Sequence, residues 1–600
     1  MKNNLCQTLY KLPGLFFDPI RKNGAFCVFM YALGAICACT TVSKGGKIYE
    51  GTWTELAVDI YLVAAVLALF PNGVRRWLRR VCYVAAYGVA LTDAYCFTKF
   101  GSTINPTMLL LLGETNANEA GDFLSTFLSF DALEGGTGWI VALLALHIIW
   151  SFIHHRLHLP QAITVPCGVR VVCSIACLAL MIWCVSEAWD NKKATWQLLS
   201  ASSPGQAEFI LTQPGHAQLY QPSWRLAFAV QANRLAATQL QTLIDGLERV
   251  SVDSCQPRGT DVVLIIGESY NRNHASLYGY NKLTTPRQQR RAARGELIPF
   301  TDVVAPWNLT SFVFKLLFSF HVNGDNDEWS DHALFPEVFR KAGYHVTFLT
   351  NQFLPRAREA VYDFSGGFFL NNPTLSQAMF DTRNTKLHVF DKGLLDDFDT
   401  LKNVRDTLNL VIFHLKGQHV NYSSKCPKSR MTWNADDYDR PKLRRKERRT
   451  LAYYDNSLVY NDSIVDQIIR RFERQEAVVI YLSDHGEQVY DDDVHFICRN
   501  HADKINAHMA HNEYEIPFWI YMSPSYRVAN PDVVKRVKRA ADKPFMSDAL
   551  PHMLVYLGGI GTDEYRSALN PLSDDYDAGR KRLLKNTTDY DEVIRKNVQP

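Results

Sequence analysis

Beyond about residue 190, the chain has no long hydrophobic run and only three of its thirteen cysteines, Cys255, Cys426 and Cys498. Three cysteines are too few for the disulfide framework of a small secreted domain, although they allow one bridge. The chain also lacks an excess of charge of either sign, because its formal net charge is +3. This balance neither favours nor excludes an anionic partner. Internal repeats and long low-complexity segments are absent as well.

Apolar segments are concentrated in the first 190 residues instead. A helix needs roughly 20 residues to cross a bilayer core of about 30 Å. Five segments approach that length, of which the second is the weakest candidate: 24–42, 55–70, 77–97, 138–154 and 165–185. A cleavable signal peptide is not expected, since four apolar segments follow the first one and no small-residue cleavage pattern accompanies it. The sequence therefore predicts a transmembrane domain of five helices over residues 1–190.

The basic residues predict how these helices are oriented. Short loops that are rich in Lys and Arg stay in the cytoplasm. Lys11, Arg21 and Lys22 precede the first segment, and four arginines lie between the second and the third, whereas the loop 98–137 carries five acidic residues and one Lys. The N-terminus is therefore predicted to be cytoplasmic. After five spans, everything beyond about residue 190 lies outside the cytoplasm.

The remainder of the chain is predicted to be an α/β domain, 251–600, joined to the membrane segments by a loop and an amphipathic helix, 191–250. Strand-like and helix-like stretches alternate in it, which is typical of a largely parallel sheet. Strands that are buried on both faces have short, continuous apolar runs rich in β-branched residues. Four runs have this character: 261–266, 345–350, 408–413 and 477–482.

Polar residues follow three of these predicted strands: Glu268, then His414 and His419, then Asp484 and His485. Open α/β sheets bind ligands beyond the carboxyl ends of their strands, so we expect these side chains at one edge. Carboxylates and imidazoles without a thiolate suit zinc or manganese. Such an ion can polarise a phosphoryl or sulfuryl oxygen and activate a hydroxyl group. Each motif alone is more typical of a turn or a surface acid, so the prediction depends on their joint placement.

Thr310 and Ser311 are the candidates for a nucleophile. They stand at the start of an apolar helical run, where free backbone N–H groups and the helix dipole favour an anionic oxygen or phosphate. The alternative is that Thr310 only caps the helix, which is the commoner role for such a residue.

Several motifs together resemble the membrane-bound phosphoethanolamine transferases of the alkaline phosphatase and sulfatase-like superfamily. They are "IIGESYNRNHASLYGYNKLTTPR", "APWNLTSFVFKLLFSF", "HLKGQHVNY" and "YLSDHGEQVYD". The resemblance implies that Glu268, Thr310, Asp484 and His485 hold a catalytic zinc ion. It also implies that Thr310 carries phosphoethanolamine from phosphatidylethanolamine to an envelope glycolipid or glycan, such as lipid A or lipopolysaccharide core.

The same resemblance implies roles for further residues and a location. His419 matches a histidine near the phosphate or a second metal ion, and His495 or His501 matches a further functional histidine. Thr115 and Glu119, in the first long external loop, match residues that line the donor lipid site. The expected location is the bacterial inner membrane, with the catalytic domain in the periplasm and no nucleic acid among the partners.

Three other functions compete with this interpretation. A sulfatase needs Arg where the motif "CQPRG" has Gly259, and that motif precedes the first strand. A phosphoglycerol transferase shares the threonine chemistry and is not excluded by the motifs. A catalytically inactive sensor or scaffold is disfavoured because all four implied metal ligands are present. The basic run 441–449 suits a phosphorylated glycolipid, but a solvated helix is the preferred reading.

Overall fold

The structure is a computed structural model of the whole chain. It describes residues 16–42, 47–100, 103–106, 135–157, 165–212, 215, 217–352, 367–401, 407–499 and 505–598. The chain forms two compact units, Met1–Ala237 and Thr238–Pro600. We call them the N-terminal unit and the C-terminal unit.

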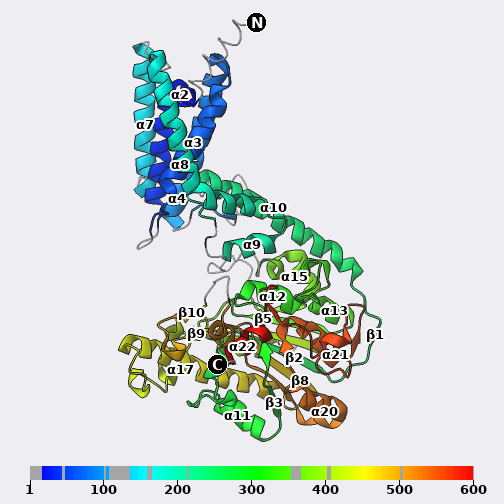
Figure 1. Cartoon of the computed structure of the whole chain (residues 1–600). Coiled ribbons are helices and arrows are strands. Elements are labelled where there is room, and N and C mark those ends of the chain that lie inside the picture. The colour runs from blue at the N-terminus through cyan, green and yellow to red at the C-terminus, as the bar shows by residue number, and fades with distance from the viewer. Residues whose placement is uncertain are drawn as a thin grey trace. The chain divides into compact units, whose positions relative to one another are not determined.

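The N-terminal unit is a bundle of long helices (Figure 1). Its helices are α2 (Asp18–Thr40), α3 (Thr52–Ala68), α4 (Asn72–Phe100), α7 (Gly135–Arg156) and α8 (Cys167–Leu199), followed by α9 (Pro204–Thr212) and the first part of α10 (Pro222–Gly246). Among the described residues, four helices are long and apolar enough to cross a membrane, namely α2, α4, α7 and α8.

The predicted number of five spanning helices is therefore wrong by one when judged on length and composition. Helix α3 forms where the second span was predicted, but it has only 17 residues. At a rise of 1.5 Å per residue it is about 26 Å long, short of a bilayer core of about 30 Å. The chain reaches Pro71 soon after, and a residue before proline disfavours the helical conformation. Proline thus limits this helix before the apolar run is long enough.

Asp59 and Asp93 are two acidic residues inside the predicted spans 55–70 and 77–97, and both have ionic partners within the N-terminal unit. Lys192 Nζ lies 2.7 Å from Asp59 Oδ1, and the Tyr220 hydroxyl donates to Asp59 Oδ2 at 2.8 Å. The Arg225 guanidinium donates to the buried carboxylate of Asp93. Both charges are thus paired, as a low-dielectric environment requires.

The C-terminal unit is built on a seven-stranded sheet. The strands lie in the order β3 (Leu297–Phe300), β11 (Phe518–Met522), β8 (Ala477–Ser483), β2 (Asp261–Gly267), β7 (Asn409–His414), β5 (His345–Thr350) and β6 (Thr382–Arg383). Only β11 pairs antiparallel with its neighbours, and the other pairs are parallel. This arrangement confirms the predicted α/β domain with a mostly parallel sheet, and β2, β5, β7 and β8 coincide with the four predicted strands.

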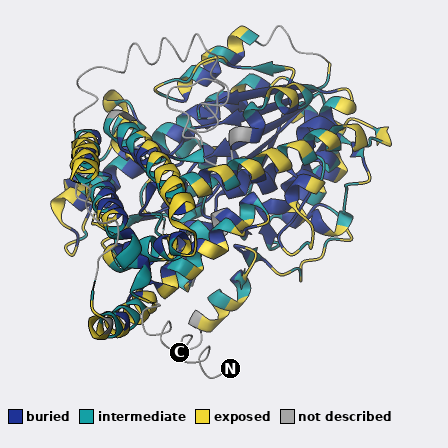
Figure 2. Cartoon of the chain, turned by 90° about the horizontal axis from the view of Figure 1, so that it is seen from above, coloured by how far each residue is buried: buried dark blue, intermediate teal, exposed yellow. Residues whose placement is uncertain are grey.

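Helices cover both faces of this sheet, so the central strands are buried (Figure 2). Successive residues of a strand point to opposite faces. On one face, Val263 and Ile265 pack in one core with Phe398 of α16 (Lys392–Leu401) and Leu458 of α17 (Arg445–Phe472). On the other face lie α12 (Thr310–Phe318), α13 (Phe335–Lys341) and α21 (Leu550–Gly558). There the ring of Phe318 in α12 packs against the ring of Phe348 in β5, with 6.2 Å between the ring centroids.

The remaining regular elements are short and lie around this core. The helices are α11 (Pro286–Ala293), α14 (Gly367–Asn371), α15 (Pro373–Met379), α18 (Ala507–Met509), α19 (Pro524–Ala529), α20 (Pro531–Ala540) and α22 (Tyr590–Val598); the strands are β1 (Ser254–Cys255), β4 (Val303–Val304), β9 (Gln488–Val489), β10 (Ile497–Cys498), β12 (Phe545–Met546), β13 (Ile560–Gly561), β14 (Leu583–Leu584) and β15 (Thr588–Asp589).

Candidate metal centre and nucleophile

Two neighbouring parallel strands bring three potential metal ligands together. Strand β2 ends at Gly267, which is paired with Ser483 at the end of β8, so the residues that follow both strands emerge side by side. These residues are Glu268 on one strand and Asp484 with His485 on the other. All three are fully buried, and their ligating atoms lie within 4.8 Å of one another. The predicted strand edge therefore contains a compact cluster of two carboxylates and one imidazole.

The backbone around Glu268 is held in an unusual conformation. Ser269 has a φ of 53°, in the left-handed region that side chains other than glycine seldom adopt. Its N–H donates to Asp484 Oδ1 at 3.1 Å, and its hydroxyl donates to Glu268 Oε1 at 2.7 Å. These two hydrogen bonds stabilise a backbone conformation that is otherwise unfavourable. Strain of this kind is concentrated at functional sites in proteins.

Thr310 reaches the same cluster from the start of α12. Its Oγ1 lies 3.2 Å from Glu268 Oε2 and 3.2 Å from His485 Nε2. The residue at the helix cap is Leu309, and no side chain caps α12 there. The alternative that Thr310 is the N-cap is thus wrong. The first N–H groups of α12 lie beside the Thr310 hydroxyl, and no side chain caps them. The start of this helix is therefore a favourable environment for an anionic oxygen.

The buried charges of the cluster have opposed pKa shifts. Burial alone would raise the pKa of Glu268, but His485, His419 and Arg499 outweigh burial and hold that pKa well below its usual range. Burial raises the pKa of Asp484 well above its usual range, and the adjacent charge of Glu268 adds to the effect. The two carboxyl groups cannot both ionise at low cost without a positive charge beside them.

Arg499 supplies a positive charge in this structure. Its Nη1 lies 2.6 Å from His485 Nε2 and 3.9 Å from Glu268 Oε1, and its side chain is only 16% exposed. His485 Nδ1 lies 2.7 Å from the carbonyl oxygen of Gly486. This geometry is that of a neutral imidazole that donates from Nδ1 and presents the lone pair of Nε2 to a cation. Burial lowers the pKa of His485, and the positive charge of Arg499 lowers it further.

The cluster fits a divalent cation. Asp484 Oδ2 is buried, and it accepts no hydrogen bond from any described residue. An unsatisfied buried carboxylate oxygen is costly, and a metal ion is one of the partners that removes the cost. Two carboxylates, one imidazole nitrogen and a hydroxyl are ligands that zinc accepts. Glu268, Thr310, Asp484 and His485 are thus the residues that could hold the ion.

The two predicted histidines at the end of β7 and in the loop after it lie in different places. His419 is half-buried, and burial lowers its pKa against the attraction of the charge on Glu268. His414 is fully buried behind the cluster, where Gln352 Nε2 lies 3.0 Å from its Nε2. Gln352 in turn donates to Glu268 Oε2 at 3.1 Å. His414 therefore does not join the cluster directly, contrary to the expectation that both histidines lie at the strand edge.

The remaining predicted site residues are not part of the described cluster. His495 is half exposed, and its Nδ1 lies 3.0 Å from Glu447 Oε2 of α17. His501, Thr115 and Glu119 lie outside the described residues. None of these four positions is therefore placed at the candidate metal centre.

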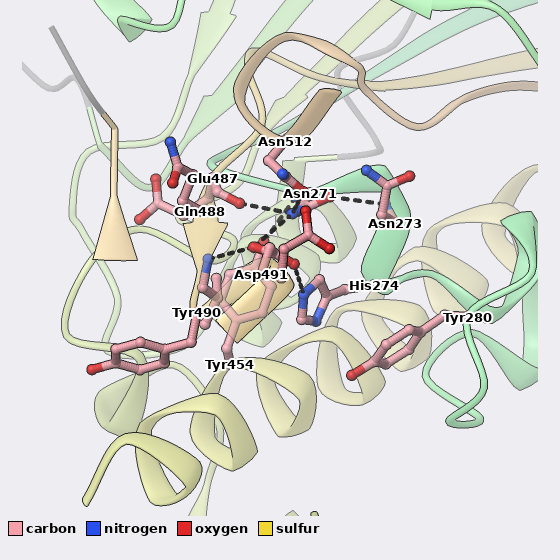
Figure 3. Close-up of polar contacts among 12 residues, drawn as sticks. Asn271, Asn273, His274, Tyr280, Tyr454, Glu487, Gln488, Tyr490, Asp491 and Asn512 are labelled. Atoms are coloured by element: carbon pink, nitrogen blue, oxygen red, sulfur yellow. Dashed lines mark hydrogen bonds and ion pairs between the residues drawn. The ribbon is translucent and has the colours of Figure 1, made fainter. Parts of the chain in front are cut away.

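A second buried network holds the loops that follow β2 and β8 (Figure 3). His274 lies between two carboxylates, with Nδ1 2.8 Å from Asp455 Oδ1 and Nε2 2.9 Å from Asp491 Oδ1. Asn271 donates to the backbone oxygen of Glu487 at 2.9 Å. The Tyr454 hydroxyl donates to the backbone oxygen of Ser269 at 2.8 Å. This network fixes the backbone on either side of the ligands.

Sequence reasoning missed Gln352, Arg499 and this network. The motif "GESYNRNH" does contain Asn271 and His274, and two polar residues so close to a ligand are a usable signal. Gln352 and Arg499 carry no such signal, because they stand in loops far along the chain from the residues that they contact.

Comparisons with known proteins identify the family of the chain. The family model described as Sulfatase matches residues 260–559. The phosphoethanolamine transferase EptC of Escherichia coli (strain K12) is 26% identical over 516 residues, which cover 84% of either chain. The Kdo(2)-lipid A phosphoethanolamine 7''-transferase of the same strain is 23% identical over 421 residues, covering 67% of this chain and 70% of that protein.

Among solved structures, the C-terminal periplasmic domain of EcEptC from Escherichia coli in complex with Zn is 26% identical, with a TM-score of 0.49. The match covers 57% of this chain and 95% of that one. The chain thus belongs to the sulfatase family, and within that family it is similar to the membrane-bound phosphoethanolamine transferases over most of its length.

Proposed function

We propose that this chain is a zinc-dependent transferase that moves phosphoethanolamine from phosphatidylethanolamine to a glycolipid or glycan of the bacterial envelope, such as lipid A or lipopolysaccharide core. The observation that carries the proposal is the position of Thr310. Its hydroxyl lies at the start of a helix without a side-chain cap and within 3.2 Å of both Glu268 and His485. The transferred phosphoethanolamine group and the lipid A acceptor are proposed from the names of the relatives.

The residues of the cluster have distinct roles in this proposal. Glu268, Asp484, His485 and Thr310 hold the cation, which supplies Lewis-acid stabilisation of negative charge on oxygen. Ser269 keeps Glu268 and Asp484 in register, and Gln352 orients the outer oxygen of Glu268. His419 is half-buried and interacts electrostatically with Glu268. It therefore lies close enough to the cluster to contact the phosphate of the donor in this proposal.

The transfer takes place in two steps. In the first step, the Thr310 oxygen forms a bond to phosphorus while the bond from phosphorus to the glycerol oxygen breaks. The Thr310 hydroxyl gives up its proton, the departing diacylglycerol oxygen takes one up, and phosphoethanolamine remains on Thr310 as a phosphodiester. In the second step, an acceptor oxygen attacks phosphorus, and the Thr310 oxygen leaves and regains a proton. Free N–H groups at the start of α12 stabilise the charge on the phosphoryl oxygens.

The proposed location is the bacterial inner membrane, with the C-terminal unit in the periplasm. The helices α2, α4, α7 and α8 account for four crossings. A cytoplasmic N-terminus and a periplasmic C-terminal unit require an odd number of crossings, which reporter fusions on either side of α3 can count. Thr115 and Glu119 are proposed to line the donor lipid site.

Mass spectrometry of Thr310 tests the proposed function. The full-length protein is incubated with phosphatidylethanolamine and zinc, and its peptides are searched for phosphoethanolamine. We expect the adduct on Thr310 in the wild type and in Ser311→Ala, and no adduct in Thr310→Ala or Glu268→Ala. Glycerophosphate on Thr310 after incubation with phosphatidylglycerol alone would identify a phosphoglycerol transferase. The absence of both adducts and of diacylglycerol release would favour an inactive scaffold.

A further inference from the structure

A cleft of about 700 Å³ lies inside the N-terminal unit, between α2, α4 and α7. The cleft is lined by α4 positions 76, 79, 80, 83, 84 and 87 and by α7 positions 144, 147, 148, 150, 151 and 154. Most of these positions recur every three or four residues and therefore form one face of each helix. From residue 76 to residue 87 there are eleven steps of about 1.5 Å, so the cleft extends about 16 Å along the bundle. Its volume suits a sizeable ligand.

The two helices run antiparallel along this cleft. The rings of Tyr83 and His147 lie 4.2 Å apart, and eleven residues away in opposite directions a Cβ on Gly136 would lie 3.4 Å from the Ala94 Cβ. The start of α4 is therefore level with the end of α7. The arginines of α4 and His154 of α7 are consequently at the same end of the cleft.

Polarity changes along the length of the cleft. Its charged end carries Arg76, Arg79 and Arg80 together with His154. Its other end is lined by apolar and aromatic side chains that include Phe26, Val84, Leu144 and Ile148. Val84 and Ile148 are 76% and 61% exposed, so apolar surface continues outward from this end. Such a gradient matches a molecule with an anionic head and hydrocarbon chains.

Among the residues that the structure describes, none supplies a negative charge to the charged end, and no carboxylate lines the cleft. Arg79 donates only to the backbone oxygen of Lys22, at 3.4 Å, and Arg76 and Arg80 form no ion pair with any residue in the described ranges. The acid at the start of α2, Asp18, is held by Arg21 and Arg170 at 2.9 and 2.8 Å. The arginines are thus available for an external anion.

We propose that this cleft binds an anionic glycerophospholipid of the phosphatidylglycerol type. Its phosphate lies against Arg76, Arg79 and Arg80, because guanidinium groups bind phosphate through paired charge-assisted hydrogen bonds. Its acyl chains lie along Val84 and Ile148. Since basic residues mark the cytoplasmic end of a membrane helix, the lipid belongs to the cytoplasmic leaflet. This proposal does not depend on the proposed function.

Lipid retention by the full-length protein tests this site. The protein is reconstituted with equal amounts of phosphatidylglycerol and phosphatidylcholine of the same acyl chains, and bound lipids are counted by native mass spectrometry. We expect retained phosphatidylglycerol to exceed phosphatidylcholine by about a hundredfold, because each of the three arginines near the phosphate contributes about fivefold in affinity. Equal retention of the two lipids would mean that the cleft holds only bulk lipid, and would overturn the proposal.

Two variants and one control locate the binding. The double substitution Arg76→Gln with Arg80→Gln should weaken phosphatidylglycerol retention about 25-fold, while Arg75 and Arg79 keep the start of α4 basic. Val84→Trp fills the apolar end without any change of charge, and should also lower retention. The control is Arg156→Gln, since this arginine ends α7 and stacks over Phe152 at 5.3 Å without lining the cleft. Unchanged retention in both cleft variants, or an equal loss in the control, would refute the site.

Discussion

At the residue scale, the candidate centre depends on close approaches that only particular side chains allow. Gly417 follows β7 in a left-handed conformation with a φ of +48°, and a Cβ there would lie 2.8 Å from the backbone nitrogen of Glu268. Its neighbour Gln418 donates to the backbone oxygen of Glu268 at 3.0 Å. A glycine is therefore required where the loop after β7 packs against the candidate metal ligand Glu268.

The substitution Gly417→Ala tests this close approach. We expect it to destabilise the C-terminal unit by about 3 kcal/mol and to lower transfer activity at least about tenfold, because it adds both backbone strain and a clash with Glu268. Gly343→Ala is the matched control: φ is +93° there, but no atom lies within 4 Å of the added Cβ. It should cost only about 1 kcal/mol and leave activity unchanged. Equal effects of both substitutions on activity would contradict the close-approach argument.

His274 makes stability depend on pH. Burial disfavours its charged form, but Asp491 and Asp455 outweigh burial and raise the pKa of His274 to about 10. A group whose pKa is higher in the folded state stabilises fully below its unfolded pKa, about 6.5 for histidine. This contribution is then lost as the pH rises through about 10.

We therefore expect His274→Gln to lower the free energy of unfolding by about 3 kcal/mol at pH 6. The gap between wild type and variant should narrow steadily as the pH is raised toward 10. The control is His495→Gln, because the side chain of His495 is 53% exposed. This substitution should lower the free energy of unfolding by less than about 0.5 kcal/mol at both pH 6 and pH 10. Thermal unfolding of the three proteins over this pH range measures the difference. A gap that stays constant with pH would show that His274 is neutral when buried.

At the element scale, the strands were the most predictable part of the fold, because each is a continuous apolar run with a polar residue at its end. Glu268, Asp484 and His485 could be placed for that reason: their strands are parallel neighbours and their positions are adjacent in register. His414 could not, since it is the last residue of β7 and points behind the cluster toward Thr350 and Gln352. Arg499 could not either, because its position depends on a loop rather than on a repeating pattern.

Helix α3 gives a prediction at the same scale. It meets the neighbouring helix α2, where Asn23 Nδ2 donates to the backbone oxygen of Ala64 at 3.1 Å. If α3 crosses the membrane, reporter fusions after residues 50, 72 and 400 should lie outside, inside and outside the cytoplasm. A short helix crosses by thinning the bilayer locally, at a modest cost. Fusions after 50 and 72 on the same side would show that α3 does not cross.

At the scale of the whole molecule, the centre links metal binding to the stability of the C-terminal unit. A ligand that binds only the folded state stabilises it by an amount that rises with the logarithm of its free concentration relative to its Kd. Treatment with a chelator should therefore lower the unfolding temperature of the full-length protein, and added zinc should restore it. Asp484→Asn should unfold at the same temperature with and without chelator. A chelator effect that persists in this variant would place the stabilising metal elsewhere.

A pre-steady-state burst measurement of diacylglycerol release tests the central claim most directly. The full-length protein, loaded with zinc, is mixed with excess phosphatidylethanolamine in the absence of an acceptor. The proposed mechanism predicts a rapid burst of about one diacylglycerol per protein chain, matched by phosphoethanolamine on Thr310, and no burst in Thr310→Ala or Asp484→Ala. A burst of the same size in Thr310→Ala, or in protein stripped of metal, would contradict it.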